Sequence, residues 1–190
     1  TFGFNQLLDR AVRHDLLGDT PLIRRVTGGR ALYHDSSEAT YAVVVNTQDL
    51  ETGSLSGSIA HTSAVIASAL TLLLDRLGLE SQYLRQTVQA DHRPEYFHTA
   101  PCFASAARHE VMSGGRKVVA SAQRRIGSTL VQHGSIKLDG VADHPALDGP
   151  ACPPDRCVRI DPLLAQRFDR IAGEFSAVMS EALGLQCEAA

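Results

Sequence analysis

The chain has 190 residues, of which 44% are hydrophobic and 21% charged, and its formal net charge is −3. That length suits one domain, and that charge gives no bulk electrostatic reason to expect binding to nucleic acid or to a membrane. No apolar run approaches the ~18 residues that a membrane-spanning helix needs. The four cysteines lack the spacing of a disulfide framework, so we expect free thiols in a cytoplasmic protein.

Short strands are predicted for the first part of the chain. The segments 21–26, 31–34 and 39–46 are expected to be strands, and a TGGR turn joins the first two. The third segment, ATYAVVVN, is a nearly continuous β-branched run, which is typical of a central strand.

A long helix follows. Residues 58–81 carry apolar side chains at helical spacing, with Ser58 or Ser56 as the N-terminal cap and Gly78 after the last turn. Residues 82–101 are polar and are expected to form a loop.

The second half of the chain changes pattern. The run RHEVMS, GRKVVASAQRRIG, STLVQHGSIKLDG predicts a meander of three antiparallel strands, with turns at Gly114-Gly115 and Gly127-Ser128. Residues 161–185 predict an amphipathic helix with Asp161 at its cap and Pro162 in its first turn. The expected fold class is therefore α+β, with mostly antiparallel strands covered by two long helices.

Two arginines stand before the Gly-Gly turn in RRVTGGRALYHD (residues 24–35). A turn with exposed backbone N–H groups beside a guanidinium can hold a carboxylate, a thioester oxygen or a phosphate. The same residues also fit a tight turn with solvated arginines. The pattern matches neither a Walker loop nor a dinucleotide-binding fingerprint.

Lys117 lies in the predicted strand GRKVVASAQRR. Strict alternation places Lys117, Val119, Ser121 and Gln123 on one face, and we expect that face to border a cavity. The opposite face would then carry Val118, Ala120 and Ala122. A lysine at a cavity can donate to a substrate carbonyl, whereas a surface lysine on an edge strand needs no function.

Three further features allow two interpretations each. His133 in QHGSI is either a base or oxyanion donor, or a histidine satisfied within the fold. Cys102 in APCFAS is either an accessible nucleophile or a buried, inert cysteine. Cys152 and Cys157 have a possible metal spacing, but a lone pair is a weak zinc signal and no metal is expected.

Taken in order, RRVTGGRALYHDSSEATYAVVV, PCFASAARHEVMSGGRKVVASAQRR and LVQHGSI resemble the lipoate/octanoate-transferring family, whose fold is shared with biotin protein ligase. The likeness is greatest to cysteine-dependent octanoyltransferases and covers most of residues 1–140. It implies a single acyltransferase domain over residues 1–190 with a class II biotin/lipoate protein ligase-like fold. Family members begin with a helix and a strand before the GFNQ turn, and we expect both to be missing here.

The resemblance also implies the site. It assigns Cys102, before Phe103, as the nucleophile and Lys117 as its catalytic partner. The substrate-binding residues that it implies are Arg25, Gly28, Gly29, Arg30, Tyr33, His34, Ser121, Gln123, His133 and Gly134. The chain departs from the family pattern at two positions. Arg30 stands where the ligases have a third glycine, which favours the octanoyltransferases, and Ala120 stands where glycine is usual in the family.

The implied reaction needs no cofactor. Cys102 would take an octanoyl group from octanoyl-acyl carrier protein and pass it to a lysine of a lipoyl domain or of the glycine-cleavage H protein. Three alternatives remain open: an ATP-dependent lipoate–protein ligase, an amidotransferase acting between carrier proteins, and a non-catalytic acyl-binding relative. No nucleic acid or membrane partner is expected.

Overall fold

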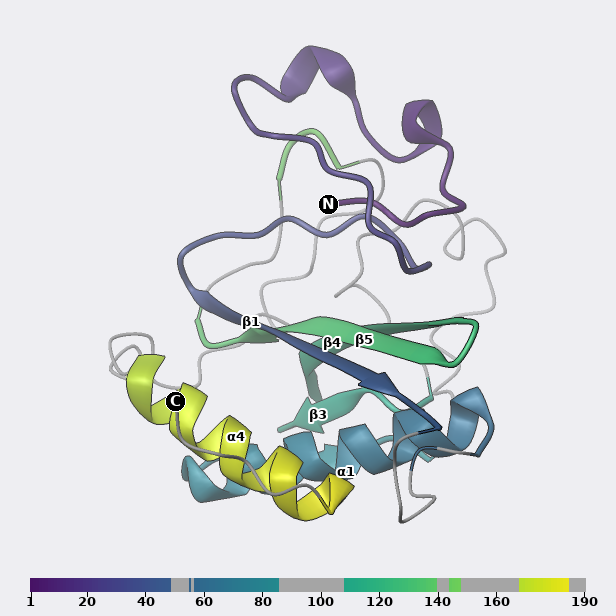
Figure 1. Ribbon diagram of the computed structural model, residues 1–190. Helices are drawn as coiled ribbons and strands as arrows, with labels where there is room; N and C mark the ends of the chain where they lie inside the picture. The colour runs from purple at the N-terminus through teal and green to yellow at the C-terminus, as the bar shows by residue number, and fades with distance from the viewer. Residues whose placement is uncertain (49–54, 56, 86–107, 140–143, 148–167, 185–190) are drawn as a thin grey trace.

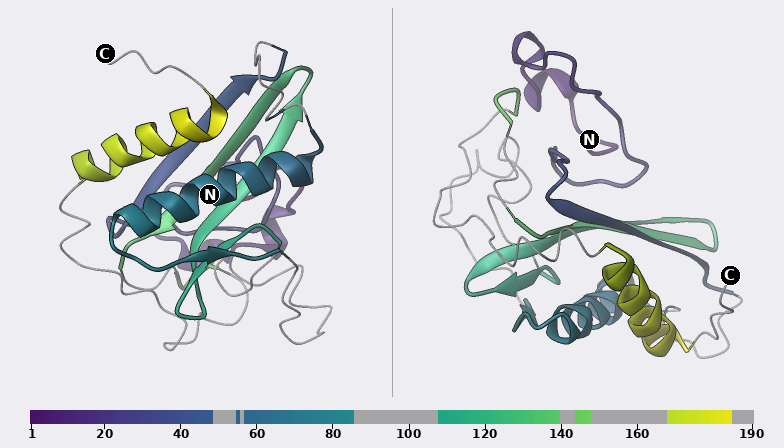
Figure 2. Two further views of the ribbon diagram at one scale, coloured as in Figure 1. Left: turned by 90° about the horizontal axis from the view of Figure 1, so that it is seen from below. Right: turned by 90° about the vertical axis from the view of Figure 1, so that its left-hand side faces the viewer.

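A computed structural model of the chain describes residues 1–48, 55, 57–85, 108–139, 144–147 and 168–184. These residues form three layers, with an irregular N-terminal segment on one side of a sheet and two helices on the other (Figures 1 and 2). The expected α+β class is confirmed, because antiparallel strands and two long helices make up the regular structure.

The sheet has five strands in the order β1-β5-β4-β3-β2, and each neighbouring pair is antiparallel. The strands are β1 (Glu38–Asn46), β2 (Gln82–Tyr83), β3 (Val111–Ser113), β4 (Arg116–Ile126) and β5 (Thr129–Lys137). The predicted meander is confirmed, since β3, β4 and β5 follow one another through turns in which Gly114, Gly115 and Gly127 have positive φ.

β1 lies at the edge of this sheet, so the expectation of a central strand for residues 39–46 is wrong. Its side chains alternate between buried and more exposed positions, and Val44 is 63% exposed. β-Branched residues favour an extended backbone at an edge as well as in the centre, and composition therefore could not place the strand.

Two helices, α1 (Ile59–Arg76) and α4 (Phe168–Leu183), pack together and cover one face of the sheet (Figure 2). The Ser58 hydroxyl accepts a hydrogen bond from the His61 backbone N–H, as predicted for the cap of α1, and Gly78 follows its end with a φ of 87°. Of the predicted helix 161–185, residues 161–167 and 185 lie outside the described residues. No helix in the described part of the chain has both the length and the apolar character to cross a bilayer.

The main core lies between the sheet and these helices. It is built from Leu, Ile, Val and Ala side chains of both helices and from the inward-facing residues of β1, β3, β4 and β5. Leu70 and Leu73 of α1 are completely buried, as are Val119 of β4 and Leu130 of β5. Removing one such leucine side chain costs about 2–5 kcal/mol, so each of these buried residues contributes substantially to the fold's stability.

The segment before β1 contains two short 3-10 helices, η1 (Leu8–Arg10) and η2 (His14–Leu16). The strands expected at 21–26 and 31–34 are absent. The first segment makes an isolated bridge between Arg24 and Phe2, and the second exchanges backbone hydrogen bonds with Thr1 at Leu32. Both segments pair with residues 1–4, and that stretch is too short to carry a continuous ladder.

β4 contains a bulge. Val111 of β3 pairs with Val119, but the next residue, Met112, pairs with Lys117, so Val118 is an extra residue. Val118 and Val119 both lie in the core beneath the helices. The prediction of uninterrupted alternation along residues 117–123 is therefore wrong, because a bulge shifts the alternation by one residue.

Candidate active site

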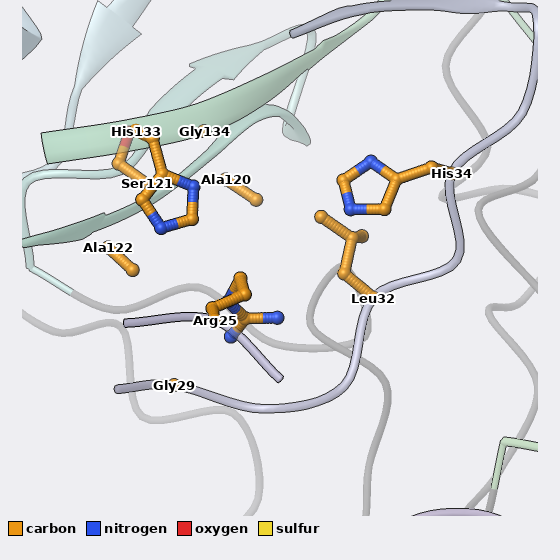
Figure 3. Close-up of a pocket in the computed structure, with 9 residues that line it drawn as sticks. All are labelled: Arg25, Gly29, Leu32, His34, Ala120, Ser121, Ala122, His133 and Gly134. Carbon is orange, nitrogen blue, oxygen red and sulfur yellow. The ribbon is translucent and has the colours of Figure 1, made fainter. Parts of the chain in front are cut away.

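A half-open pocket lies on the side of the sheet away from the helices. Its floor comes from β4 and β5, and its roof from the segments before β1 (Figure 3). The lining residues are Arg25, Gly29, Leu32, His34, Ala120, Ser121, Ala122, His133 and Gly134. The pocket thus lies where the N-terminal segment faces the centre of the sheet.

The floor is formed by small side chains. Ala120 and Ala122 point into the pocket, and His133 lies directly opposite Ala122 across the β4–β5 ladder (Figure 3). Gly134 has no room for a side chain, since a Cβ would lie against the Ala120 carbonyl and 2.7 Å from Cε1 of Tyr41. The small side chains of Ala120 and Ala122 leave space for an apolar ligand group to lie close to the strand backbones.

The roof is held by Arg25. Its guanidinium donates from Nη2 to the carbonyl oxygens of Gly28 and Arg30 at 3.0 and 2.9 Å, and from Nη1 to the Thr1 hydroxyl at 3.1 Å. Gly29, between those two carbonyls, has a φ of 94°, which is a strained conformation for any residue with a Cβ. A Cβ there would also approach Nη2 of Arg25 at 3.1 Å. Arg25 and Gly29 therefore fix the loop as a unit.

His133 joins the floor to the roof. Its Nε2 lies 2.6 Å from the hydroxyl of Thr27, which is completely buried. Burial, together with the charges of Arg25 and His34, lowers the pKa of His133. The imidazole is therefore held in its neutral form at neutral pH, with one nitrogen bound to Thr27.

His34 closes one end of the pocket through a chain of hydrogen bonds. Its Nδ1 bonds to the carboxylate of Glu38, which also accepts from the Ser135 hydroxyl at 2.7 Å. A carboxylate only accepts, so Nδ1 must carry the proton in this bond. Nε2 of His34 lies 2.8 Å from the Thr1 hydroxyl, which connects it to Arg25.

Lys117 lies on the same side of the sheet as the pocket floor. Val111 points toward the helices, so its neighbours Glu110 and Met112 point to the other side, and Lys117 shares that side as the partner of Met112. The Lys117 ammonium forms an ion pair with the Glu110 carboxylate, and its side chain is only 2% exposed. The bulge at Val118 is what turns Lys117 to this side.

The structure brings together only some of the residues expected in the site. Arg25, Gly29, His34, Ser121, His133 and Gly134 line the pocket, whereas Gly28, Arg30, Tyr33, Lys117 and Gln123 do not. Gly28 and Arg30 contribute carbonyl groups to Arg25, and Tyr33 lines a separate small pocket against His144. Ser121 contributes its backbone, because its hydroxyl bonds to Tyr41 on the helix side at 2.6 Å. Gln123 also points to the helix side, where it bonds to Thr62 and Gln132.

Cys102 and Phe103 lie outside the described residues, as do Cys152 and Cys157. Within the described ranges, no three His, Cys, Asp or Glu side chains are grouped as a metal site. The pocket combines an apolar floor with the guanidinium of Arg25 and the imidazoles of His34 and His133. That combination suits an apolar chain that ends in a carbonyl or carboxylate group.

Sequence reasoning missed Thr27, Glu38 and Glu110. A signal existed for Glu110, because Gly114-Gly115 closes a hairpin in which residues shortly before the turn face residues shortly after it. No comparable signal existed for Thr27, whose partner His133 is 106 positions away.

Residues 1–146 match the family of lipoyl protein ligase A/B catalytic domains. The octanoyltransferase LipM of Kyrpidia tusciae is 38% identical over 117 residues, which are 62% of this chain and 41% of that protein. The octanoyltransferase LipM of Moorella thermoacetica is 37% identical over 145 residues, or 73% of this chain and 49% of that protein. The chain thus spans about half the length of these relatives or less.

Solved structures show the same fold. A crystal structure of lipoate-protein ligase A bound with ATP superposes with a TM-score of 0.73 at 19% identity, covering 100% of this chain and 70% of that one. A putative lipoate protein ligase from T. acidophilum with bound lipoic acid gives 0.68 at 19% identity, covering 98% and 69%. The expected class II ligase-like fold is confirmed.

Proposed function

We propose that this chain, which belongs to the family of lipoyl protein ligase A/B catalytic domains, transfers octanoyl groups from a carrier protein to a protein lysine through a thioester on Cys102. The observation that carries the proposal is the alanine-floored pocket beneath the Arg25–Gly29 loop, with Lys117 on the same side of the sheet. Sequence likeness to octanoyltransferases at 37% and 38% identity supports the same activity.

The pocket floor holds the acyl chain in this proposal. Ala120 and Ala122 form an apolar surface, and Leu32 faces them from the roof (Figure 3). Burying the chain is worth roughly 5 kcal/mol, at about 0.8 kcal/mol for each of about six methylenes. Arg25 and His133, at the polar rim, hold the thioester end.

In the first half-reaction, the Cys102 thiolate attacks the carbonyl carbon of octanoyl-acyl carrier protein. A new carbon–sulfur bond forms, the bond to the carrier sulfur breaks, and the carrier leaves as a thiolate that takes up a proton. Lys117 donates a hydrogen bond to the carbonyl oxygen while negative charge develops on it. One thioester replaces another, so the step needs no ATP.

In the second half-reaction, the neutral amine of an acceptor lysine attacks the acylated Cys102. An amide bond forms, the amine loses a proton to solvent, and the cysteine leaves as its thiolate. A lipoyl domain or the glycine-cleavage H protein is the proposed acceptor. Because an amide is more stable than a thioester, the transfer runs downhill.

Intact mass spectrometry tests this proposal directly. The purified chain is incubated with octanoyl-acyl carrier protein, with and without ATP, and then with a lipoyl domain. We expect an octanoyl adduct that forms without ATP, is released by hydroxylamine, and disappears when the lipoyl domain is added.

Two serine variants provide the matched control. Cys102→Ser should lose the adduct, because an unactivated hydroxyl is a far weaker nucleophile than a thiol near neutral pH. Cys187→Ser should keep it. If Cys102→Ser transfers as well as the parent, or if octanoylation requires free octanoate and ATP, the ligase alternative replaces this proposal.

A further inference from the structure

Glu110 and Lys117 form an ion pair that is almost completely removed from water. Their side chains are 11% and 2% exposed, and an Nζ–H of Lys117 donates to Oε1 of Glu110. Removing one partner of such a pair leaves an uncompensated buried charge, whereas two well-packed apolar residues would often be no less stable. Stability alone therefore does not account for an ion pair at this position.

The backbone before Glu110 is bent in an unusual way. His109 has a φ of 68°, in the left-handed region that residues with a Cβ seldom adopt. The strand edge on either side is fixed, since Leu84 N–H donates to the Glu110 carbonyl at 2.9 Å and His109 N–H donates to the Leu84 carbonyl at 2.8 Å. Such a conformation costs about 1–3 kcal/mol and persists where the surroundings enforce it.

Two irregularities thus meet at one ion pair. The left-handed His109 lies just before β3, with Glu110 directed to the pocket side of the sheet, and the bulge at Val118 turns Lys117 to that same side. Without the bulge, Lys117 would point toward the helices. Both departures from regular β-structure serve the placement of the same two side chains.

We propose that Glu110 is a positioning residue that fixes the Lys117 ammonium as an oriented hydrogen-bond donor for the acyl carbonyl. This inference rests on the proposed octanoyl transfer. The carboxylate takes one N–H of the ammonium and balances its charge. Nζ is thereby held in one direction, and the remaining N–H groups keep fixed directions as well. Glu110 acts through Lys117 and does not touch the substrate.

A second buried pair on the same side of the sheet provides a matched control. Lys137 donates to Asp35 at 2.6 Å, and these side chains are 1% and 23% exposed. Asp35 also accepts from the backbone and the hydroxyl of Ser37, so this pair ties the turn before β1 to the end of β5. Like Lys117 and Glu110, neither Lys137 nor Asp35 lines the pocket. Unlike that pair, Lys137 and Asp35 have no part in the proposed acyl transfer.

The experiment compares the rate of Cys102 acylation in Glu110→Gln, Glu110→Asp and Asp35→Asn. We expect kcat in Glu110→Gln to fall by up to about 100-fold, since a displacement of about 1 Å in a catalytic group is enough for that loss. The KM for octanoyl-acyl carrier protein should stay within a few-fold. Glu110→Asp should recover part of kcat, and Asp35→Asn, although less stable to urea, should keep the parent kcat when folded.

A double-mutant cycle separates positioning from general destabilisation. Lys117→Met removes the ammonium and should lower kcat by about 100-fold or more. If Glu110 acts only through Lys117, adding Glu110→Gln to Lys117→Met lowers kcat no further. The double variant also removes both buried charges, so it is expected to fold even if Glu110→Gln alone does not.

The outcomes distinguish this inference from the function on which it rests. If the parent forms no octanoyl thioester at Cys102, the proposed function fails. If the parent is acylated but folded Glu110→Gln keeps the parent kcat, or if the two substitutions lower kcat independently, the ion pair is structural and Glu110 has no positioning role.

Discussion

The two faces of β4 and β5 carry different side chains: large apolar residues face the helices, and small residues face the pocket. On the helix side, Val119, Leu130 and Ile136 join a leucine-rich core, and the polar residues among them are hydrogen-bonded to one another. On the pocket side, Ala120 and Ala122 leave space. Because successive residues of a strand alternate between its faces, a single segment can supply stability on one side and a binding surface on the other.

The polar residues on the helix side form one continuous chain of hydrogen bonds. Thr62 of α1 donates to Gln123, Gln123 donates to Gln132, Gln132 lies 3.4 Å from the Tyr41 hydroxyl, and that hydroxyl bonds to Ser121. Burial raises the pKa of Tyr41, so its hydroxyl remains protonated. The chain holds α1, β1, β4 and β5 together directly beneath the pocket floor.

The largest expected effect is on stability, from a side chain at Gly134. Gly134→Ala places a methyl group against the Ala120 carbonyl and the Tyr41 ring, so the strands or the ring must move. We expect the free energy of unfolding to fall by about 3 kcal/mol, at the upper end of typical overpacking costs. Urea denaturation measures this. An unchanged denaturation midpoint would contradict this prediction, because it would show that the neighbouring strands and the Tyr41 ring make room for the methyl group with no loss of stability.

Tyr41→Phe should have the next largest effect. It removes the hydroxyl that Ser121 and Gln132 use, and the buried polar groups left behind cost about 1–3 kcal/mol of folding free energy. Octanoyl transfer per folded molecule should stay within a few-fold. The double variant Tyr41→Phe/Ser121→Ala should recover part of the stability, and strictly additive losses would contradict a shared hydrogen bond.

Gly29→Ala tests the pocket side. Its φ of 94° and its contact with Arg25 oppose a Cβ, so we expect the free energy of unfolding to fall by about 1 kcal/mol. We also expect a loss of the octanoyl-transfer rate per folded molecule. Gly28→Ala is the matched control, because a Cβ there meets no described atom within 4 Å. Equal transfer rates in the two variants would show that the loop is merely a turn.

The smallest expected effect is a pH dependence from His133. Burial and the charges of Arg25 and His34 lower its pKa below the ordinary value of 6.5, so the unfolded chain takes up this proton first as the pH falls. Stability should therefore be lost as the pH drops below about 6.5. Denaturation at pH 7 and pH 5 should show a smaller loss for His133→Gln than for the parent. His14→Gln, in an exposed segment, controls for the loss of an imidazole.

The regular elements were largely predictable because their signals are local. The helical spacing and Ser58 cap defined α1, and the Gly114-Gly115 and Gly127-Ser128 turns defined the meander. Capping, amphipathic spacing and positive-φ turns depend on residues within a few positions of one another. These signals also placed Lys117 on a strand.

The face that Lys117 occupies could not be predicted from alternation. Strict period two would have grouped it with Ser121 and Gln123, whose side chains point to the helices. The extra residue Val118 reverses that grouping, and a bulge of this kind carries no distinct mark in a stretch of valines. Whether Cys102 lies near Lys117 stays a prediction, since Cys102 falls outside the described residues.

The sequence by itself determined the α+β class, the strand meander, the capped helix and the motif order that resembles the lipoate/octanoate-transferring family. Only the tertiary structure decided that β1 is an edge strand and that Glu110 forms an ion pair with Lys117. It also decided that Arg25 hydrogen-bonds to the loop around Gly29, next to Ala122. The physical reason is the sequence separation over which each kind of interaction acts. Backbone preferences act over a few residues, whereas strand order and pocket contacts depend on which distant segments bury surface against each other.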